Sequence, residues 1–70
     1  MRGIVKWFNN DLGYGFIDYN GEEVFVRYDS IISEGYKSLI KDERVIFDIV
    51  ETPRGFKAKN VMSLDQIKMI

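Results

Sequence analysis

The sequence contains no cysteine and no histidine, and only one proline among its 70 residues. Without cysteine the chain forms neither disulfides nor thiolate metal sites, which stabilise many small domains. Histidine is the commonest general base and metal ligand, so zinc binding and Cys/His catalysis lack their usual groups. We therefore expect no metal site and no cofactor. A chain of this length predicts one domain that buries only about 60% of its unfolded surface.

Long apolar runs and an excess of positive charge are also missing. No run approaches the roughly 18 to 20 residues of a membrane span. Met1-Arg2-Gly3 leads directly into a strand-like segment without the apolar core of a signal peptide, which predicts a soluble, cytoplasmic protein. Ten Lys and Arg stand against eleven Asp and Glu, giving a formal net charge of -1. Because nucleic-acid binders usually carry a basic face or a high pI, charge alone does not indicate that function.

What the sequence does have is a two-residue alternation of apolar and polar side chains, which indicates β-strands. We predict five strands, at residues 2–9, 13–19, 22–28, 44–51 and 56–62. Asn20-Gly21 is the strongest short-range hairpin signal, because a type I′ turn needs positive φ at both central residues. Thr52-Pro53-Arg54-Gly55 predicts another turn. Residues 29–43 are predicted to form a loop, with room for a single helical turn near Ser30 to Ser33.

Five short strands without a long helix predict an all-β fold. We expect a closed or nearly closed antiparallel barrel, because closure removes the sheet edges that a small protein would otherwise expose. The alternation predicts that the core of this barrel contains these apolar side chains: Val5, Ile17, Val24, Val26, Val45, Phe47, Ile49 and Val61. In the first strand the adjacent Trp7 and Phe8 point to opposite faces unless a bulge intervenes.

Aromatic side chains, at 14% of the sequence, are the strongest clue to function. We assign Trp7, Tyr14, Phe16 and Phe25 to the face opposite the aliphatic core set, on three adjacent strands. Aromatic residues in small β proteins are often core residues, but a contiguous exposed patch usually marks an interaction site. Glycine inside a strand often marks close approach by a ligand or another backbone. We interpret the glycines at 13 and 15 as flat ground on which a planar base lies beside the rings.

Four segments, in this order and spacing, resemble the bacterial cold-shock protein family: Lys6-Trp7-Phe8-Asn9, Gly13-Tyr14-Gly15-Phe16-Ile17, Val24-Phe25-Val26 and Glu34-Gly35-Tyr36-Lys37. The resemblance covers residues 2–62. It implies a five-stranded OB-fold barrel over residues 1–62 that binds single-stranded RNA and DNA and acts as an RNA chaperone. Residues 13–19 also fit the RNP1 pattern of the RRM fold. An RRM needs an RNP2 strand ahead of that pattern, and only eleven residues precede Leu12, so we favour the cold-shock fold over an RRM.

The resemblance also implies roles for individual side chains. The rings that would stack on bases are Trp7, Tyr14, Phe16, Phe25, Tyr28 and Tyr36. Lys6, Arg54 and Lys57 would lie along the phosphate backbone, and Glu23 would accept a hydrogen bond from a base edge. The family residue at Phe8 is partly structural.

The chain departs from the family pattern at several positions. Leu12 stands where the family usually has lysine, which removes one phosphate partner. Arg27 stands where the family usually has histidine, and a guanidinium both stacks and pairs with phosphate. Tyr14 and Tyr36 replace phenylalanines and retain a ring. Phe56 replaces a proline or small residue, where it either extends the platform or covers the barrel end.

Residues 63–70 form a C-terminal extension beyond the family's usual end. Ser63 with Gln66 fits a weak capping box for one or two helical turns. Its apolar residues, Leu64, Ile67, Met69 and Ile70, would pack on the barrel or on a second copy, or else the end frays. We expect a monomer, with a dimer through this extension as the alternative.

Three other functions remain open on the sequence. The first is a small barrel whose aromatic groove takes a peptide, as SH3-like domains do. The second is an enzyme using carboxylates from Asp18, Glu23, Asp29 and Asp48, although no nucleophile or phosphate loop accompanies them. The third is a diverged family member whose nucleic-acid binding has weakened.

Overall fold

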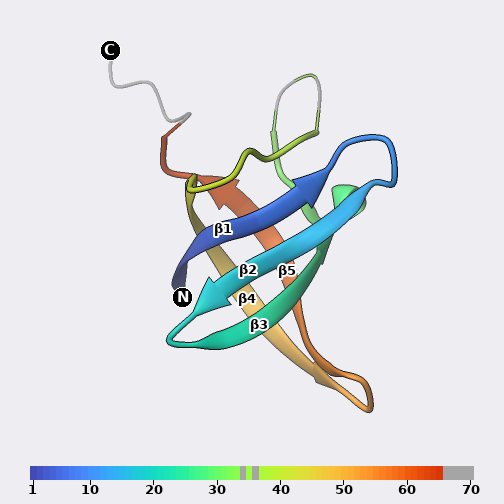
Figure 1. Ribbon diagram of the computed structural model, residues 1–70, viewed down its shortest axis with the longest axis vertical. Coiled ribbons are helices and arrows are strands. Elements are labelled where there is room, and N and C mark those ends of the chain that lie inside the picture. Colours follow the sequence, from blue (N-terminus) through green and yellow to red (C-terminus); the bar gives the residue numbers. More distant parts are fainter. Residues whose placement is uncertain (34, 36, 66–70) are drawn as a thin grey trace.

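The computed structural model describes residues 1–33, 35 and 37–65. It contains the strands β1 (Arg2–Asn9), β2 (Tyr14–Tyr19), β3 (Glu22–Arg27), β4 (Arg44–Thr52) and β5 (Gly55–Ser63), with a 3-10 turn η1 (Tyr28–Ser30) after β3. The strands close into a barrel in the order β1-β2-β3-β5-β4 (Figure 1). The predicted all-β barrel is therefore confirmed, with strand ends within one residue of those predicted from the alternation.

One pairing in the barrel is parallel, which the sequence analysis did not anticipate. β3 and β5 run parallel, with Val24 beside Phe56 and Phe25 beside Lys57. The other four pairings are antiparallel. A closed ring with an odd number of strands cannot alternate direction throughout, so closure with five strands requires at least one parallel pair.

The predicted hairpin turn between β2 and β3 is confirmed. Asn20 and Gly21 have φ values of 51° and 86°, the positive values that a type I′ turn needs. The Gly21 amide also donates a hydrogen bond of 3.0 Å to Asp18 Oδ1. At the β4–β5 turn, the Thr52 hydroxyl donates to the Gly55 carbonyl at 2.8 Å. Both turns therefore form where the sequence predicts them.

The predicted helical turn is displaced by two residues. It spans Tyr28–Ser30 instead of starting at Ser30. Ile31 ends it, because this side chain is buried in the core and its backbone forms a bridge with Val61. Tertiary packing of one residue thus sets the end of the turn.

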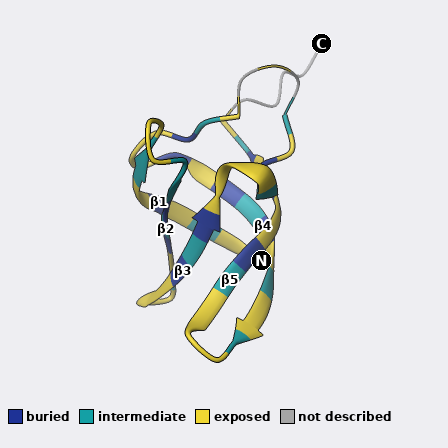
Figure 2. Ribbon diagram, turned by 90° about the vertical axis from the view of Figure 1, so that its right-hand side faces the viewer, coloured by how far each residue is buried: buried dark blue, intermediate teal, exposed yellow. Residues whose placement is uncertain are grey.

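The core occupies the barrel interior, as the alternation of buried and exposed positions along the strands shows (Figure 2). Seven of the eight predicted core residues are buried, and the eighth, Ile49, is partly buried against them. Ile31, Leu39 and Ala58 complete the core and were not predicted. Leu39 lies in the loop before β4, where no periodicity marks an apolar residue as buried. None of the described residues forms a helix long and apolar enough to cross a membrane.

Glu43 is a buried carboxylate immediately before β4. It accepts hydrogen bonds from the Ser63 hydroxyl and, at 3.0 Å, from the Ile40 amide. Its main-chain carbonyl accepts from the Val5 amide at 2.8 Å. Ser63 is thus the last residue of β5 and a partner of Glu43, and its capping box with Gln66 stays a prediction. The remainder of the predicted helical turn, residues 66–70, lies outside the described residues.

We expect Glu43→Ala to lower the free energy of unfolding by about 1–3 kcal/mol, because it leaves the Ile40 amide and the Ser63 hydroxyl without this acceptor. Urea denaturation at neutral pH measures the change. Glu51→Ala, on the exposed part of β4, is the matched control and should change stability by no more than about 0.5 kcal/mol. Equal effects of the two substitutions would show that the Glu43 hydrogen bonds do not stabilise the loop.

Candidate functional site

A β-bulge in β1 controls which side chains reach the outer surface. Val5 lies opposite Ile17 of β2, but Trp7, two residues later, lies opposite Phe16, so Lys6 is the extra residue. Lys6 and Trp7 are both exposed, while Phe8 lies opposite Gly15 and packs against the core. The bulge, left open by the sequence, therefore turns Trp7 outward while Phe8 keeps its structural position.

Four rings form a continuous cluster on the outer face of β1, β2 and β3, which we call the aromatic platform: Trp7, Tyr14, Phe16 and Phe25. Tyr14 lies at the centre, with ring centroids 5.6 Å from both Trp7 and Phe25 and 6.4 Å from Phe16. Phe16 and Phe25 are 5.8 Å apart. Trp7 is 41% exposed. The predicted placement of these rings opposite the core is confirmed.

The glycines beside the platform do not provide open ground for a base, so this interpretation was wrong. A Cβ at Gly15 would overlap the Trp7 carbonyl oxygen and lie 2.6 Å from Phe8 Cα, because the bulged β1 passes over this residue. At Gly13, where φ is +77°, a Cβ would lie 3.1 Å from the Tyr28 ring. Each glycine instead allows close packing within the protein, of the β1 backbone against Gly15 and of the Tyr28 side chain against Gly13.

Ion pairs border the platform. The Lys6 ammonium lies 2.9 Å from Glu23 Oε2, and this hydrogen bond and charge raise the pKa of Lys6 above its ordinary value. Arg27 lies opposite Tyr14 and has its Nε 3.7 Å from Asp29 Oδ1. All four side chains are about half exposed. Asp29, the partner of Arg27, was considered on the sequence only as a carboxylate of an enzyme and not as a residue of the nucleic-acid site.

A groove of about 410 Å³ lies beyond Tyr14, between the β1–β2 loop and the loop that follows β3. Its lining includes Leu12, Tyr28 and Lys37. Leu12 is 61% exposed and Tyr28 is 48% exposed. Leu12 therefore presents an apolar side chain to the groove at the position where the resemblance led us to expect a cation. Tyr36, predicted to stack, lies outside the described residues.

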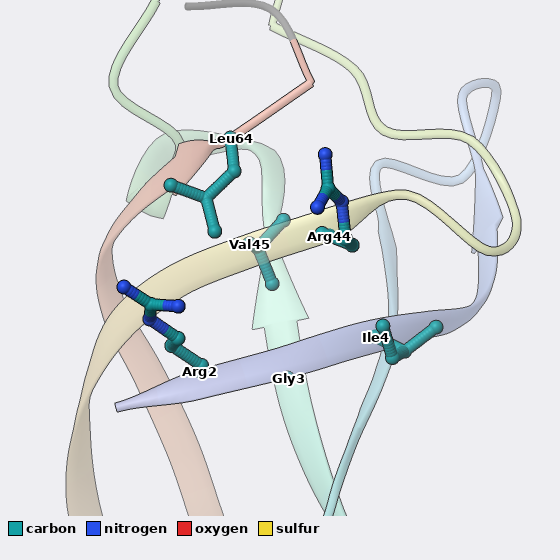
Figure 3. Close-up of a pocket in the computed structure, with 6 residues that line it drawn as sticks. All are labelled: Arg2, Gly3, Ile4, Arg44, Val45 and Leu64. Carbon is teal, nitrogen blue, oxygen red and sulfur yellow. The ribbon is translucent and has the colours of Figure 1, made fainter.

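A second groove, of about 240 Å³, lies between β1 and β4 beside Leu64 (Figure 3). No aromatic ring is among its lining residues. Arg44 lies at the rim of this groove. Its Nη2 donates a hydrogen bond to Asp65 Oδ1 at 2.7 Å, and its backbone amide donates one to Asp65 Oδ2 at 2.9 Å. These backbone and side-chain hydrogen bonds hold the pKa of Asp65 below its ordinary value. This groove offers no surface for stacking.

The chain that forms this barrel and platform also matches a known family. The model of the "Cold-shock" DNA-binding domain matches residues 1–64. The chain belongs to the cold-shock domain family. It is 52% identical over 65 residues to the cold shock-like protein CspB of Bacillus cereus, covering 91% of this chain and all of that protein. It is equally identical to the cold shock protein CspB of Geobacillus stearothermophilus, of which it covers 98%.

The family assignment confirms the resemblance drawn from the four sequence segments. It also makes the chain a nucleic-acid-binding protein. A more distant relative, the cold shock-like protein CspA of Shewanella violacea, is 45% identical over 64 residues, which cover 89% of this chain and 91% of that protein.

The remaining predicted site residues of the cold-shock domain lie on and before β5. Lys57 pairs with Phe25 and is partly buried beside the platform. Phe56 pairs with Val24, so it lies on the other side of β5 from Lys57, at the barrel end, and is 36% exposed. Arg54 is exposed in the β4–β5 turn. The fold thus brings Lys57 to the face of the platform and places Phe56 on the opposite face of β5.

Proposed function

We propose that the protein binds single-stranded RNA and DNA by stacking bases on the aromatic platform, and that it acts as an RNA chaperone. The observation that carries the proposal is the contact between four partly exposed rings across three neighbouring strands, with centroids 5.6 to 6.4 Å apart. The groove lined by Leu12, Tyr28 and Lys37 continues this surface. A strand of several nucleotides therefore finds the four rings of the platform and, in the groove, a further ring at Tyr28.

Stacking explains both the preference for single strands and the chaperone activity. Each base stacked on an aromatic ring contributes about 1–3 kcal/mol and does so with little sequence preference, because every base has a π-face. In a duplex those faces are covered by neighbouring bases. A protein that holds unpaired bases consequently favours the open form of a weak RNA hairpin. We expect the protein to act as a monomer in the cytoplasm.

The test is the fluorescence of Trp7 during titration with an oligo-dT or oligo-U hexamer at low salt. Saturable quenching is the expected result, because Trp7 is exposed and belongs to the platform. A filter-binding or anisotropy assay with labelled hexamer serves as the independent measurement. If neither method detects binding, the proposed function is wrong.

We expect a shallow salt dependence of this binding. For single strands, log K falls with log salt by about 0.7 for each neutralised phosphate. Lys6 and Arg27 are already paired with carboxylates, and Leu12 adds no charge. The slope should therefore be shallower than about -4, the value that corresponds to roughly six phosphate contacts. Titrations between low and physiological salt measure it, and a steeper slope would contradict binding dominated by stacking.

A further inference from the structure

The outer face of β1–β3 carries a charged row directly beside the aromatic one. Asp18 of β2 lies opposite Glu23 of β3, two residues from the pair formed by Phe16 and Phe25. Lys6 projects from the bulge in β1 and reaches past β2 to Glu23, with 2.9 Å between Nζ and Oε2. Asp18 adds a weaker attraction for the same ammonium, and together these charges raise the pKa of Lys6. The ammonium beside Trp7 is thus held by the protein's own carboxylates.

The same arrangement recurs at the other side of the platform. Arg27 lies opposite Tyr14, and its guanidinium is 3.7 Å from the carboxylate of Asp29 in η1. Lys6 and Arg27 are the basic residues of β1 and β3 that border the platform, and each faces an acidic partner. Both pairs are open to solvent, so a phosphate group can approach either cation.

We propose that Glu23 and Asp29 are internal competitors of the phosphodiester backbone, which hold Lys6 and Arg27 in place of phosphate until a strand displaces them. The inference rests on the proposed function and concerns the ligand chemistry of the same site. It implies that the site selects its ligand mainly by base stacking and gains little from backbone charge.

The strength of these ion pairs fits such an exchange. Ion pairs between exposed side chains are weak, and they are screened by salt. A phosphate therefore displaces the carboxylate readily, but the strand must first break the ion pair. Each pair lowers the affinity for a charged strand without blocking the platform.

The family resemblance assigns Glu23 a different role, as the acceptor of a hydrogen bond from a base. The two roles predict opposite results when the carboxylate is removed. A base acceptor contributes to affinity, so its loss weakens binding of any hexamer that carries the base. A competitor of phosphate reduces affinity, so its loss strengthens binding, and only for a strand with a charged backbone.

The experiment measures binding of two dT hexamers, one with phosphodiester and one with uncharged methylphosphonate linkages, to the full chain and to Glu23→Gln. We expect Glu23→Gln to bind the phosphodiester hexamer about two- to fivefold more tightly at low salt, in line with the modest strength of an exposed pair. Its salt slope should steepen by about 0.7, the contribution of one added phosphate contact. Affinity for the methylphosphonate hexamer should not rise.

Two further variants serve as controls. Glu22→Gln removes the same charge from the adjacent position, which lies opposite Tyr19 and has no ion pair among the described residues. It should not reproduce the gain. In a Lys6→Gln background the effect of Glu23→Gln should disappear, because coupled residues are not additive. Asp29→Asn should give a smaller gain of the same kind, since its pair is longer.

Several results would overturn the inference while leaving the proposed function intact. These are unchanged affinity, weaker binding of both hexamers by Glu23→Gln, an equal gain in Glu22→Gln, and a gain that persists without Lys6. If the unmodified protein binds neither hexamer, the proposed function fails and the inference fails with it.

Discussion

Gly15→Ala is expected to lower the free energy of unfolding by about 3 kcal/mol or more, at the upper end of overpacking substitutions. The added Cβ would overlap the Trp7 carbonyl oxygen and lie 2.6 Å from Phe8 Cα. Because these are backbone atoms of the bulged strand, they cannot move aside as the end of a flexible side chain does. A single core in a chain of this size supplies only about 3–5 kcal/mol, so the variant should retain no more than about 2 kcal/mol of stability.

Urea denaturation and far-UV circular dichroism measure this effect. Gly21→Ala is the matched control, because its Cβ would meet no atom within 4 Å but its φ of +86° is unfavourable for alanine. It should lose about 1–2 kcal/mol, the cost of the left-handed conformation. If Gly15→Ala is as stable as Gly21→Ala, β1 does not pass as closely over β2 as the structure shows.

Phe16→Ala is expected to weaken binding of a dT hexamer by about 1–3 kcal/mol, which corresponds to roughly 5- to 150-fold in Kd. Phe16 is the middle residue of its row, lying opposite Trp7 on β1 and Phe25 on β3. Its removal therefore takes one stacking surface from this row, while Tyr14 keeps its contacts with Trp7 and Phe25. Titration of Trp7 fluorescence and anisotropy of labelled hexamer give the two Kd values.

Two further substitutions separate stacking from apolar bulk at this position. Phe16→Tyr keeps the ring and should bind within about twofold of the unmodified protein, whereas Phe16→Leu keeps an apolar side chain but should lose most of the affinity. Phe16 is partly buried, so thermal unfolding of each variant verifies that it is folded at the titration temperature. Unchanged binding by folded Phe16→Ala would show that bases do not stack on Phe16.

Much of the barrel was predictable because its signals are local. Asn20-Gly21 predicts the hairpin turn, since only residues that tolerate positive φ fit there. Alternation in β2 and β3 predicts which side chains face the core, and Phe16 and Phe25 lie outside as expected. The order of the cold-shock segments along the sequence predicts the family and, with it, the aromatic platform.

Features that depend on contacts between distant segments were not predictable. The parallel pairing of β3 with β5 follows from closing a ring of five strands, and it places Lys57 beside Phe25. Leu39 is buried although its loop has no periodic pattern. The sequence suggests that Gly15 leaves room for a base, whereas in the fold the backbone of β1 occupies that room.

The sequence by itself determined the strands, the hairpin turn, the core face and the aromatic face, because side-chain alternation and turn chemistry act between neighbouring residues. Only the tertiary structure decided what surrounds the platform. The bulge at Lys6 turns Trp7 outward, and the curvature of the barrel brings Lys6 to Glu23 across an intervening strand. Charge interactions depend on distance in space rather than on separation in sequence. The pairing of Lys6 and Arg27 with carboxylates is therefore shown only by the folded chain.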